Sequence, residues 1–216
     1  MALLDLLVPA ACSGCGAYGE TLCRRCRSSF RPASAARDRF VAPDPATVVG
    51  DELQVAVAAF AYEGRLRRAL ARLKYGGAAR LAGPLADAAT PLLGPFVCLH
   101  AGATLVPVPV HRDRLRQRGY NQAALLARRL GLELGRPVAD VLARARPTGL
   151  QHRLNRAERL RNLHGAFAVR PEVRAPPQVI LVDDILTTSA TLEACAAVLR
   201  AAGSERVVGV AIAREL

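Results

Sequence analysis

A β-α-β pattern near the end of the sequence sets the fold class. Residues 178–185 (QVILVDDI) form a near-continuous apolar run, which is typical of a parallel strand buried on both faces. A helical pattern follows at 190–202, where Gly203 suits the C-terminal cap, and 206–213 (RVVGVAIA) is a second buried strand. Parallel strands joined by a helix require a right-handed crossover, so the pattern predicts an α/β sheet.

The preceding residues continue this alternation of strands and helices. Further strands are expected at 53–62, at 103–110, near 138–143 and at 165–169, and helices at 64–75, 79–93 and 120–134. A polar, arginine-rich loop is expected over 144–163. Apolar residues make up 51% of the chain, which is enough for a real core and excludes a disordered protein. We predict a mostly parallel sheet flanked by helices.

Three parts of the chain differ in composition. Residues 1–30 contain a tight cysteine cluster, 31–50 are rich in Pro, Ala and Ser as in a linker, and 51–216 form the expected main domain. No run approaches about 20 uninterrupted apolar residues, so no membrane span is expected. The start of the chain lacks the basic residues and the uninterrupted apolar run of a secretion signal, so a cytoplasmic location is expected.

Two Cys-x2-Cys pairs, separated by seven residues, predict a metal site. Its four ligands would be Cys12, Cys15, Cys23 and Cys26. Two such pairs facing each other bring four thiolates into a tetrahedron. Disulfides compete with this interpretation, and a chain without a secretion signal disfavours them. Iron fits the same ligands, but closed four-cysteine sites most often hold structural Zn2+, which we favour.

The positive charge of the chain is concentrated in one region. The formal net charge is +12, and residues 112–161 hold 13 Arg against four acidic residues. Such clustering indicates a polyanion partner, such as phosphates, a diphosphate ligand or nucleic acid, although a solvated surface without a partner is the alternative. The chain has only nine aromatic residues, five Phe and four Tyr, which argues against a protein built mainly on base stacking.

The segment 179–191 (VILVDDILTTSAT) carries the most specific chemistry. Asp183 and Asp184 stand at the C-terminal end of a buried strand, where α/β sheets bind ligands. A turn of small hydroxyl residues then opens a helix, whose backbone N–H groups suit a phosphate. The two carboxylates can accept hydrogen bonds from sugar hydroxyls. A simple helix cap would need only one of these residues.

This segment resembles the signature of the type I phosphoribosyltransferases, which bind 5-phosphoribosyl-1-pyrophosphate (PRPP) with Mg2+. The resemblance implies that Asp183 and Asp184 contact the ribose hydroxyls. It also implies that the 5-phosphate is held by Thr187, Thr188, Ser189, Ala190 and Thr191. The family usually has Gly where this chain has Ser189, and a non-Gly residue with left-handed backbone costs about 1–2 kcal/mol.

Two basic segments extend the same resemblance. The first, at 111–122 (HRDRLRQRGYNQ), corresponds to the loop near the pyrophosphate and would contribute Arg112, Arg116, Arg118, Asn121 and Gln122. The alternative, the start of a solvent-exposed helix, fits some of these arginines but does not account for the RGYNQ run. The second resembles the hood that closes over the site and would contribute Gln151, Arg159 and Asn162. Closure of a hood excludes water from the reacting centre.

Together these motifs are similar to the ComF (ComFC-type) competence proteins, which couple a four-cysteine zinc motif to a phosphoribosyltransferase domain. The resemblance also includes LLVPAACSGCG and YEGRLRRALARLKYGG, with Lys74 and Tyr75, and covers essentially the whole chain. It implies a role in natural transformation, with PRPP and Mg2+ as ligands and single-stranded DNA or DNA-uptake proteins as partners.

Two hypotheses stay open on function. In one, the chain is a phosphoribosyltransferase with an unidentified acceptor. In the other, it is a non-catalytic DNA-binding module that keeps the PRPP site as a sensor or a relic.

Overall fold

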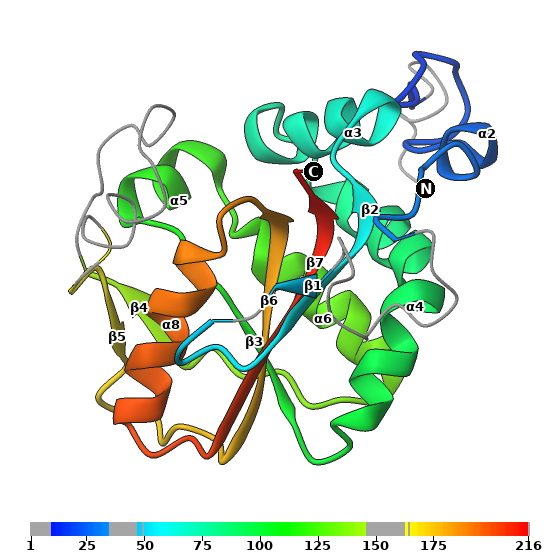
Figure 1. Cartoon of the computed structure of the whole chain (residues 1–216). Coiled ribbons are helices and arrows are strands. Elements are labelled where there is room, and N and C mark those ends of the chain that lie inside the picture. The colour runs from blue at the N-terminus through cyan, green and yellow to red at the C-terminus, as the bar shows by residue number, and fades with distance from the viewer. Residues whose placement is uncertain (1–9, 35–46, 49, 146–162, 164, 216) are drawn as a thin grey trace.

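A five-stranded sheet forms the centre of the protein, in a computed structural model that describes residues 10–34, 47–48, 50–145, 163 and 165–215 (Figure 1). Its strands, in spatial order, are β1 (Thr47–Val48), β2 (Ala56–Ala61), β7 (Arg206–Arg214), β6 (Gln178–Leu186) and β3 (Thr104–Pro107). Strands β2, β7, β6 and β3 are parallel, and only the edge strand β1 is antiparallel. The predicted α/β fold with a mostly parallel sheet is confirmed.

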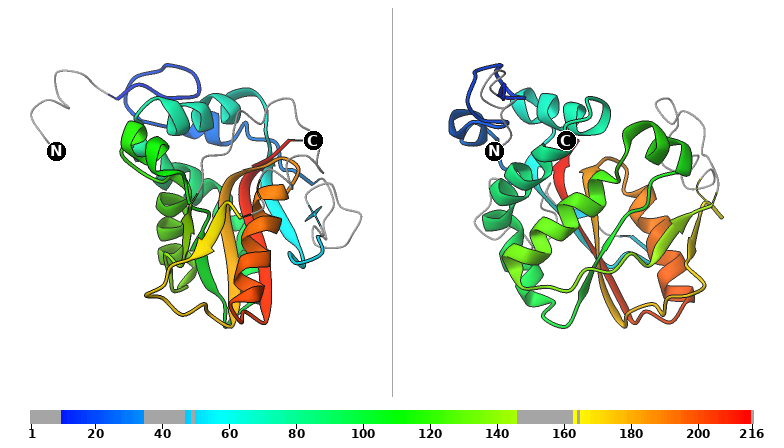
Figure 2. Two further views of the ribbon diagram at one scale, coloured as in Figure 1. Left: turned by 90° about the vertical axis from the view of Figure 1, so that its left-hand side faces the viewer. Right: turned by 180° about the vertical axis from the view of Figure 1, so that it is seen from behind.

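Helices cover both faces of this sheet. The helices in the described part of the chain are α2 (Arg24–Arg27), α3 (Gly64–Tyr75), the short 3-10 helix η1 (Ala79–Leu81), α4 (Ala82–Leu99), α5 (Arg112–Arg118), α6 (Gln122–Leu134) and α8 (Ala190–Ala201). Figure 1 looks onto the face covered by α8, and the right-hand view of Figure 2 looks onto the face covered by α4 and α6. At the C-terminal ends of the parallel strands lie α3, α5 and the cysteine segment.

Alternation of side chains along β6 divides the core into two layers. Ile180 and Val182 pack with residues of α3, α4 and α6, whereas Val179 and Leu181 pack with residues of α8. Successive side chains of a strand point to opposite faces, so a strand buried on both faces must be apolar throughout. This burial explains why the sequence of β6 reads as one continuous apolar run.

Two helices differ from the sequence-based expectation. The helix predicted to end at residue 93 continues to Leu99 through Pro91 and Pro95, because Phe96 and Val97 of its last turns are buried in the core. The first basic segment contains a separate helix, α5, which has no buried residue. Because α5 lacks an apolar face, it has no periodic pattern by which it could have been predicted.

The span Ala79–Leu99 has the length and the mean hydropathy, 1.2, of a membrane-crossing helix. Half of its apolar window is buried inside the structure, where α4 packs against the sheet. Its apolar character is therefore accounted for by the core. It is the one such helix among the residues that the structure describes.

Two predicted strands pair outside the central sheet. They form β4 (Leu142–Arg144) and β5 (Phe167–Val169), which make an antiparallel two-stranded sheet. The sequence placed them in the alternation of the main sheet, so this expectation needs correction. Only an isolated bridge from Val138 to Leu105 attaches this region to β3 in the parallel direction.

A buried carboxylate fastens the chain ahead of β2. Glu193, on α8, accepts hydrogen bonds from the backbone N–H groups of Asp51 (2.9 Å), Glu52 (2.7 Å) and Leu53 (3.2 Å). A Cβ atom at Gly50 would lie 1.9 Å from Glu193 Oε2, so this position has no room for a side chain. Glu193 therefore joins α8 to a segment far away in the sequence.

We expect Glu193→Ala to destabilise the fold by about 2–4 kcal/mol, because it leaves several backbone donors without their charged acceptor. Urea unfolding followed by circular dichroism measures the loss. The matched control is Glu205→Ala, at an exposed glutamate, which should change stability by less than about 0.5 kcal/mol. Equal losses in the two variants would contradict the fastening role.

Candidate functional site

The acidic pair lies where β6 projects beyond its neighbour β3. The last residue pair between these strands joins Pro107 and Val182, one position before Asp183. On its other side, β6 stays paired with β7 as far as Leu186. The two aspartates therefore stand on a firmly held strand with one open edge. This placement confirms the expected position at the C-terminal end of a parallel strand.

The two carboxylates face opposite sides of the sheet, because side chains alternate along a strand. Asp184 lies on the side of α3, where Lys74 Nζ is 3.0 Å from Asp184 Oδ2. The side chains of Lys74 and Asp184 are only 22% and 3% exposed. Burial acts to lower the pKa of Lys74, but the charges of Asp184 and Asp183 outweigh it and raise that pKa. Lys74 is thus held as an ammonium group.

Asp183 lies toward α8 and the β4–β5 sheet. Burial, together with the charge of Asp184, raises the pKa of Asp183 well above its usual range, and Lys74 only partly opposes this effect. On this side lies Arg144 of β4, whose pKa is lowered by burial and by the charge of Arg114, with only a small opposing effect of Asp183. Its guanidinium lies 5.3 Å from the centre of the Phe167 ring. Lys74 is therefore the cation that directly contacts the acidic pair, through Asp184.

The sequence analysis assigned neither Lys74 nor Arg144 as a site residue. Lys74 had one usable signal, since it is the only lysine of an arginine-rich chain. Arg144 begins the second basic segment, which the resemblance likens to the hood, but its place on β4 beside Phe167 depends on the β4–β5 pairing.

The turn after β6 has the backbone shape expected of the family's glycine. Ser189 has φ +58° and ψ −4°, and it is the one non-glycine residue with positive φ among those described. Its side chain is 4% exposed, and its Oγ donates a hydrogen bond to the Thr188 carbonyl at 2.6 Å. Helix α8 begins at Ala190, so its unpaired N–H groups open at this turn. Thr187 is exposed, and Thr191 is half-buried.

We expect Ser189→Gly to be more stable than Ser189→Ala by up to about 1 kcal/mol, because both variants lose the Oγ hydrogen bond and only glycine relieves the left-handed backbone. It removes about 1–2 kcal/mol of backbone strain, against an entropic cost of about 0.5–1 kcal/mol for glycine. Ser189→Ala keeps the strain and loses the Oγ hydrogen bond, so it should cost about 1 kcal/mol. Thermal unfolding of both variants tests this order. A greater loss in the glycine variant would contradict the left-handed turn.

The turn between α5 and α6 is built from the RGYNQ motif. Asn121 caps α6, since its Oδ1 accepts from the N–H of Ala123 (3.0 Å) and its Nδ2 donates to the Val108 carbonyl (3.0 Å). Gln122 is buried, and its Oε1 accepts from Arg118. The Asn121 and Gln122 side chains thus form hydrogen bonds that stabilise the turn between α5 and α6.

The same turn contacts the end of α3. The Tyr120 hydroxyl donates to the Leu73 carbonyl at 2.7 Å, and the Arg118 guanidinium lies 5.7 Å from the centre of the Tyr75 ring. Leu73 and Tyr75 are the sequence neighbours of Lys74. The structure therefore brings three sequence motifs together at one end of the sheet: the acidic pair, the Lys74–Tyr75 pair and the RGYNQ turn.

The other predicted basic residues are less enclosed. Arg112 and Arg116 are exposed on α5, and Arg116 lies 3.9 Å from Asp113. His111 caps this helix, because its Nδ1 accepts from the N–H of Asp113. The hood residues named above lie outside the described part of the chain: Gln151, Arg159 and Asn162.

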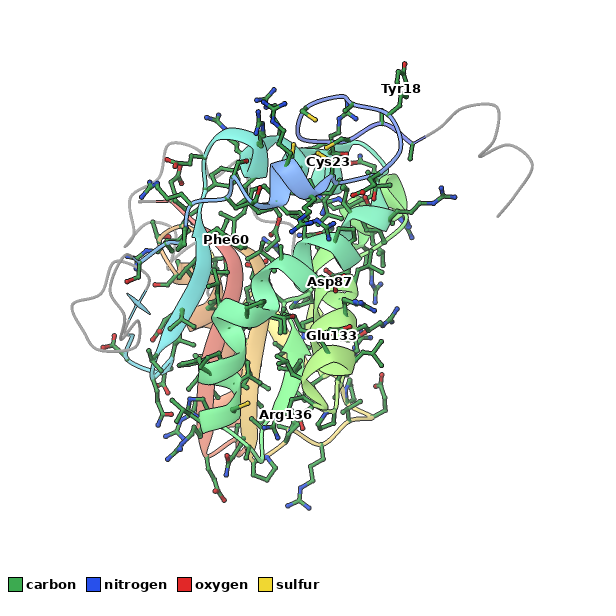
Figure 3. All side chains as sticks on the ribbon, turned by 90° about the vertical axis from the view of Figure 1, so that its right-hand side faces the viewer. Tyr18, Cys23, Phe60, Asp87, Glu133 and Arg136 are labelled. Atoms are coloured by element: carbon green, nitrogen blue, oxygen red, sulfur yellow. The ribbon has the colours of Figure 1, made fainter. Side chains whose placement is uncertain are left out.

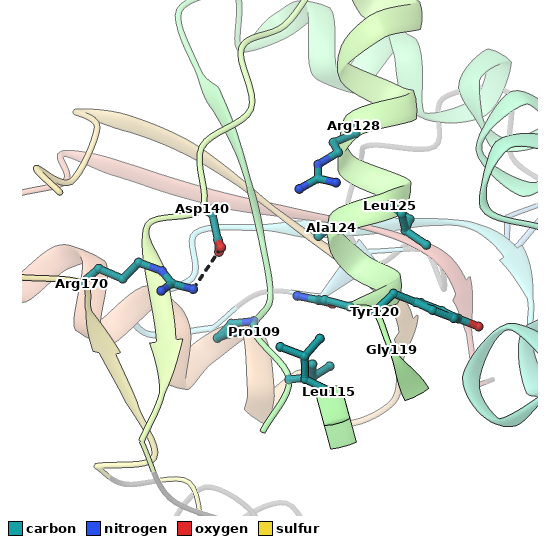
Figure 4. Close-up of a pocket in the computed structure, with 11 residues that line it drawn as sticks. Pro109, Leu115, Gly119, Tyr120, Ala124, Leu125, Arg128, Asp140 and Arg170 are labelled. Atoms are coloured by element: carbon teal, nitrogen blue, oxygen red, sulfur yellow. Dashed lines mark hydrogen bonds and ion pairs between the residues drawn. The ribbon is translucent and has the colours of Figure 1, made fainter. Parts of the chain in front are cut away.

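A pocket of about 310 Å³ lies beside the RGYNQ turn (Figure 4). Tyr120, Leu125 and Arg128 line one side, and an ion pair between Arg170 and Asp140, at 3.0 Å, lines the other. The aspartates of β6 are not among its lining residues. The pocket is therefore separate from the acidic pair.

The four cysteines of the Cys-x2-Cys pairs meet as predicted. Their sulfur atoms all lie within 4.8 Å of one another, with 3.6 Å between Cys12 and Cys26 and 3.8 Å between Cys15 and Cys23. A tetrahedron with Zn–S bonds of about 2.3 Å has edges of about 3.8 Å, so the cluster fits a metal such as zinc. None of the four is bonded to another in this structure, and the mutual approach of all four sulfur atoms favours a metal over two separate disulfides. Cys23, at the start of α2, is labelled in Figure 3.

Local hydrogen bonds shift the pKa values of the two buried thiols of this cluster in opposite directions. Burial acts to raise the pKa of Cys12, but backbone N–H groups, that of Cys23 first among them, lower it to about 6. Burial and the neighbouring thiols raise the pKa of Cys26 above its ordinary value. A Cβ atom at Gly14 would lie 2.7 Å from Cys26 Sγ, so the first pair needs glycine there.

Comparison with known proteins finds relatives whose names concern DNA uptake. The chain is 36% identical over 106 residues to competence protein F of Haemophilus influenzae, which is 48% of this chain and 46% of that protein. It is 36% identical over 104 residues to the DNA utilization protein YhgH of Escherichia coli K12, covering 48% and 45%. It is 32% identical over 102 residues to competence protein ComFC of Streptococcus pneumoniae, covering 47% and 44%.

Similarity to these relatives over about half of the chain supports the ComF family. The match spans about half the length of these relatives and about half of this chain. No protein-family model matches the chain. The resemblance of its motifs to the ComF family is thus accompanied by similarity to relatives named for competence and DNA utilization.

Proposed function

We propose that this chain is a cytoplasmic competence protein, acting in natural transformation, that binds PRPP with Mg2+ at the acidic pair. The observation that carries the proposal is the strand–turn–helix unit of β6 and α8. It presents two carboxylates and a left-handed turn at the open end of a parallel sheet. The names of the relatives support the role in DNA uptake.

Each part of PRPP has matching groups in this arrangement. Asp183 and Asp184 would accept hydrogen bonds from the ribose hydroxyls. The N–H groups and hydroxyls of residues 187–191 would hold the 5-phosphate, since a helix N-terminus favours an anion. The pyrophosphate would meet the cations of the basic segments, namely Arg112, Arg116 and Arg118 of the first segment and Arg159 of the hood.

The residues present also fit the two metals. Mg2+ prefers carboxylate and phosphate oxygens, which the acidic pair and PRPP supply together, and when bound it would neutralise pyrophosphate charge. The cysteine cluster would hold a structural Zn2+, because four protein ligands leave no open position for chemistry. If transfer occurs, the ribose–pyrophosphate bond breaks and a bond to the acceptor forms. The nearby cations would then stabilise the leaving pyrophosphate.

Calorimetric titration of PRPP into the zinc-loaded protein, in the presence of Mg2+, tests the proposal directly. We expect saturable binding with one site per chain. Heats equal to those of dilution, in protein with its metal cluster intact, would contradict a working PRPP site.

A second function, direct binding of single-stranded DNA, is favoured by the surface of α5. Arg112, Arg114 and Arg116 are all exposed on this helix, which buries no residue of its own. Binding driven by phosphate contacts releases counterions, so the affinity falls steeply as salt rises. Fluorescence anisotropy with a labelled oligonucleotide tests this function. Changing the three arginines to glutamine should flatten the salt dependence, and an unchanged dependence would exclude α5 as the contact.

A further inference from the structure

The only lysine of the chain lies at the acidic pair rather than on the surface. Its partner Asp184 is buried, and their ion pair measures 3.0 Å. A buried carboxylate without a counter-charge is strongly unfavourable, and here a second carboxylate, Asp183, is next to it. Lys74 therefore supplies the positive charge that this pair needs while no ligand is bound.

The backbone that carries Lys74 is fixed on both sides. The Leu73 carbonyl accepts the Tyr120 hydroxyl, and the Tyr75 ring lies under Arg118. The lysine side chain is a compact charge on a flexible four-carbon stem, which can change its partner while its backbone stays in place. The contacts of its neighbours thus hold the backbone of Lys74 beside the RGYNQ turn, while its ammonium group pairs with Asp184.

We propose that Lys74 exchanges partners when the ligand binds. In the free protein it neutralises Asp184. When ribose hydroxyls and a divalent cation bind to the Asp184 carboxylate, the ammonium group of Lys74 moves to the pyrophosphate group of PRPP. This inference rests on the proposed function, since it assigns Lys74 as a binding residue of the same site.

If Lys74 exchanges partners, then Lys74→Met should have opposite effects on the binding of Mg2+ alone and of PRPP with Mg2+. Lys74 competes with Mg2+ for Asp184, so Lys74→Met should bind Mg2+ alone more tightly. The same variant lacks a charged contact to the diphosphate, so it should bind PRPP with Mg2+ more weakly. A residue that served only to maintain the fold would weaken both.

Calorimetry with Lys74→Met measures the two affinities. We expect Mg2+ alone to bind about fivefold more tightly and PRPP with Mg2+ about tenfold more weakly, the scale of one charge-assisted hydrogen bond. The matched control is Arg72→Met, which removes one positive charge at an exposed position of the same helix and should change neither affinity more than about twofold. Weakening of both ligands in Lys74→Met would overturn the inference.

The unsubstituted protein provides a second measurement, which does not depend on how the variant folds. Protein labelled with 13C at lysine alone gives one set of lysine resonances, all from Lys74. Their Cε–Hε shifts should move with PRPP and Mg2+ and saturate at the calorimetric affinity. If calorimetry shows that PRPP binds with Mg2+ but the lysine resonances do not move, then Lys74 does not exchange partners.

The two experiments separate failure of the inference from failure of the proposed function. If PRPP produces no heat in the unsubstituted protein, then the proposed function is wrong and the diphosphate half of the inference falls with it. Titration with Mg2+ alone then tests whether Lys74 leaves Asp184. The readouts are the shift of the lysine resonances and the Mg2+ affinity of Lys74→Met.

Discussion

Changing Asp183 and Asp184 together to asparagine is expected to weaken binding of PRPP with Mg2+ at least about 100-fold. Each carboxylate would offer a charged acceptor to the ligand, and such hydrogen bonds contribute about 1.5–3 kcal/mol each. Asparagine keeps the shape of the side chain but removes the negative charge that the ribose hydroxyls and Mg2+ would meet. Calorimetry on the zinc-loaded protein measures the loss.

The stability of the double asparagine variant must be measured separately, because Lys74 loses its ion-pair partner Asp184. The free energy of unfolding should fall by a few kcal/mol, as when a buried ion pair is broken at one side. Adding Lys74→Met to the double variant removes the unpaired ammonium and should recover part of the stability, without restoring PRPP binding. The matched control for charge is Asp51→Asn, at an exposed aspartate outside the site.

PRPP affinity within about threefold of the original in the double asparagine variant would show that the ligand binds elsewhere. DNA binding should be unchanged in this variant, because α5 and its arginines are left intact. A parallel loss of DNA binding would contradict two separable activities.

Cys26→Ser is expected to abolish metal binding and to release the N-terminal segment from the main domain. Cys26 is fully buried, and it belongs to the same core cluster as Phe30 and Leu66. Structural zinc contributes about 10–16 kcal/mol of binding free energy in small zinc modules, so its loss outweighs the local packing. Elemental analysis should find about one zinc per chain in the unsubstituted protein and none in the variant.

Limited proteolysis reports the structural consequence of losing the metal. Cleavage within residues 10–34 should become at least about tenfold faster in Cys26→Ser, since local unfolding exposes this segment. Cys98→Ser is the matched control, because Cys98 is exposed and stands outside the cluster. It should keep both its zinc and its resistance to protease. Iron in place of zinc would correct the metal, and metal retained by Cys26→Ser would contradict the four-cysteine site.

Much of the candidate site could be predicted because its signals are local. The apolar run of β6, its two aspartates and the hydroxyl-rich turn are neighbours in the chain. Their periodicity and chemistry therefore predict a strand, a turn and a helix in that order. The same holds for the cysteine pairs, whose spacing within a short segment allows few other arrangements. Even the strain at Ser189 follows from comparing one residue with the family's glycine.

Local sequence predicted the β6–α8 unit and the cysteine cluster, but the partners of their side chains depend on packing. Lys74 reaches Asp184, and Glu193 holds the segment before β2, only because distant elements meet at the sheet. The β4–β5 pairing and the polar helix α5 also have no periodic signal of their own. Periodicity describes neighbours in the chain, whereas these contacts are set by how helices and strands pack when the core closes.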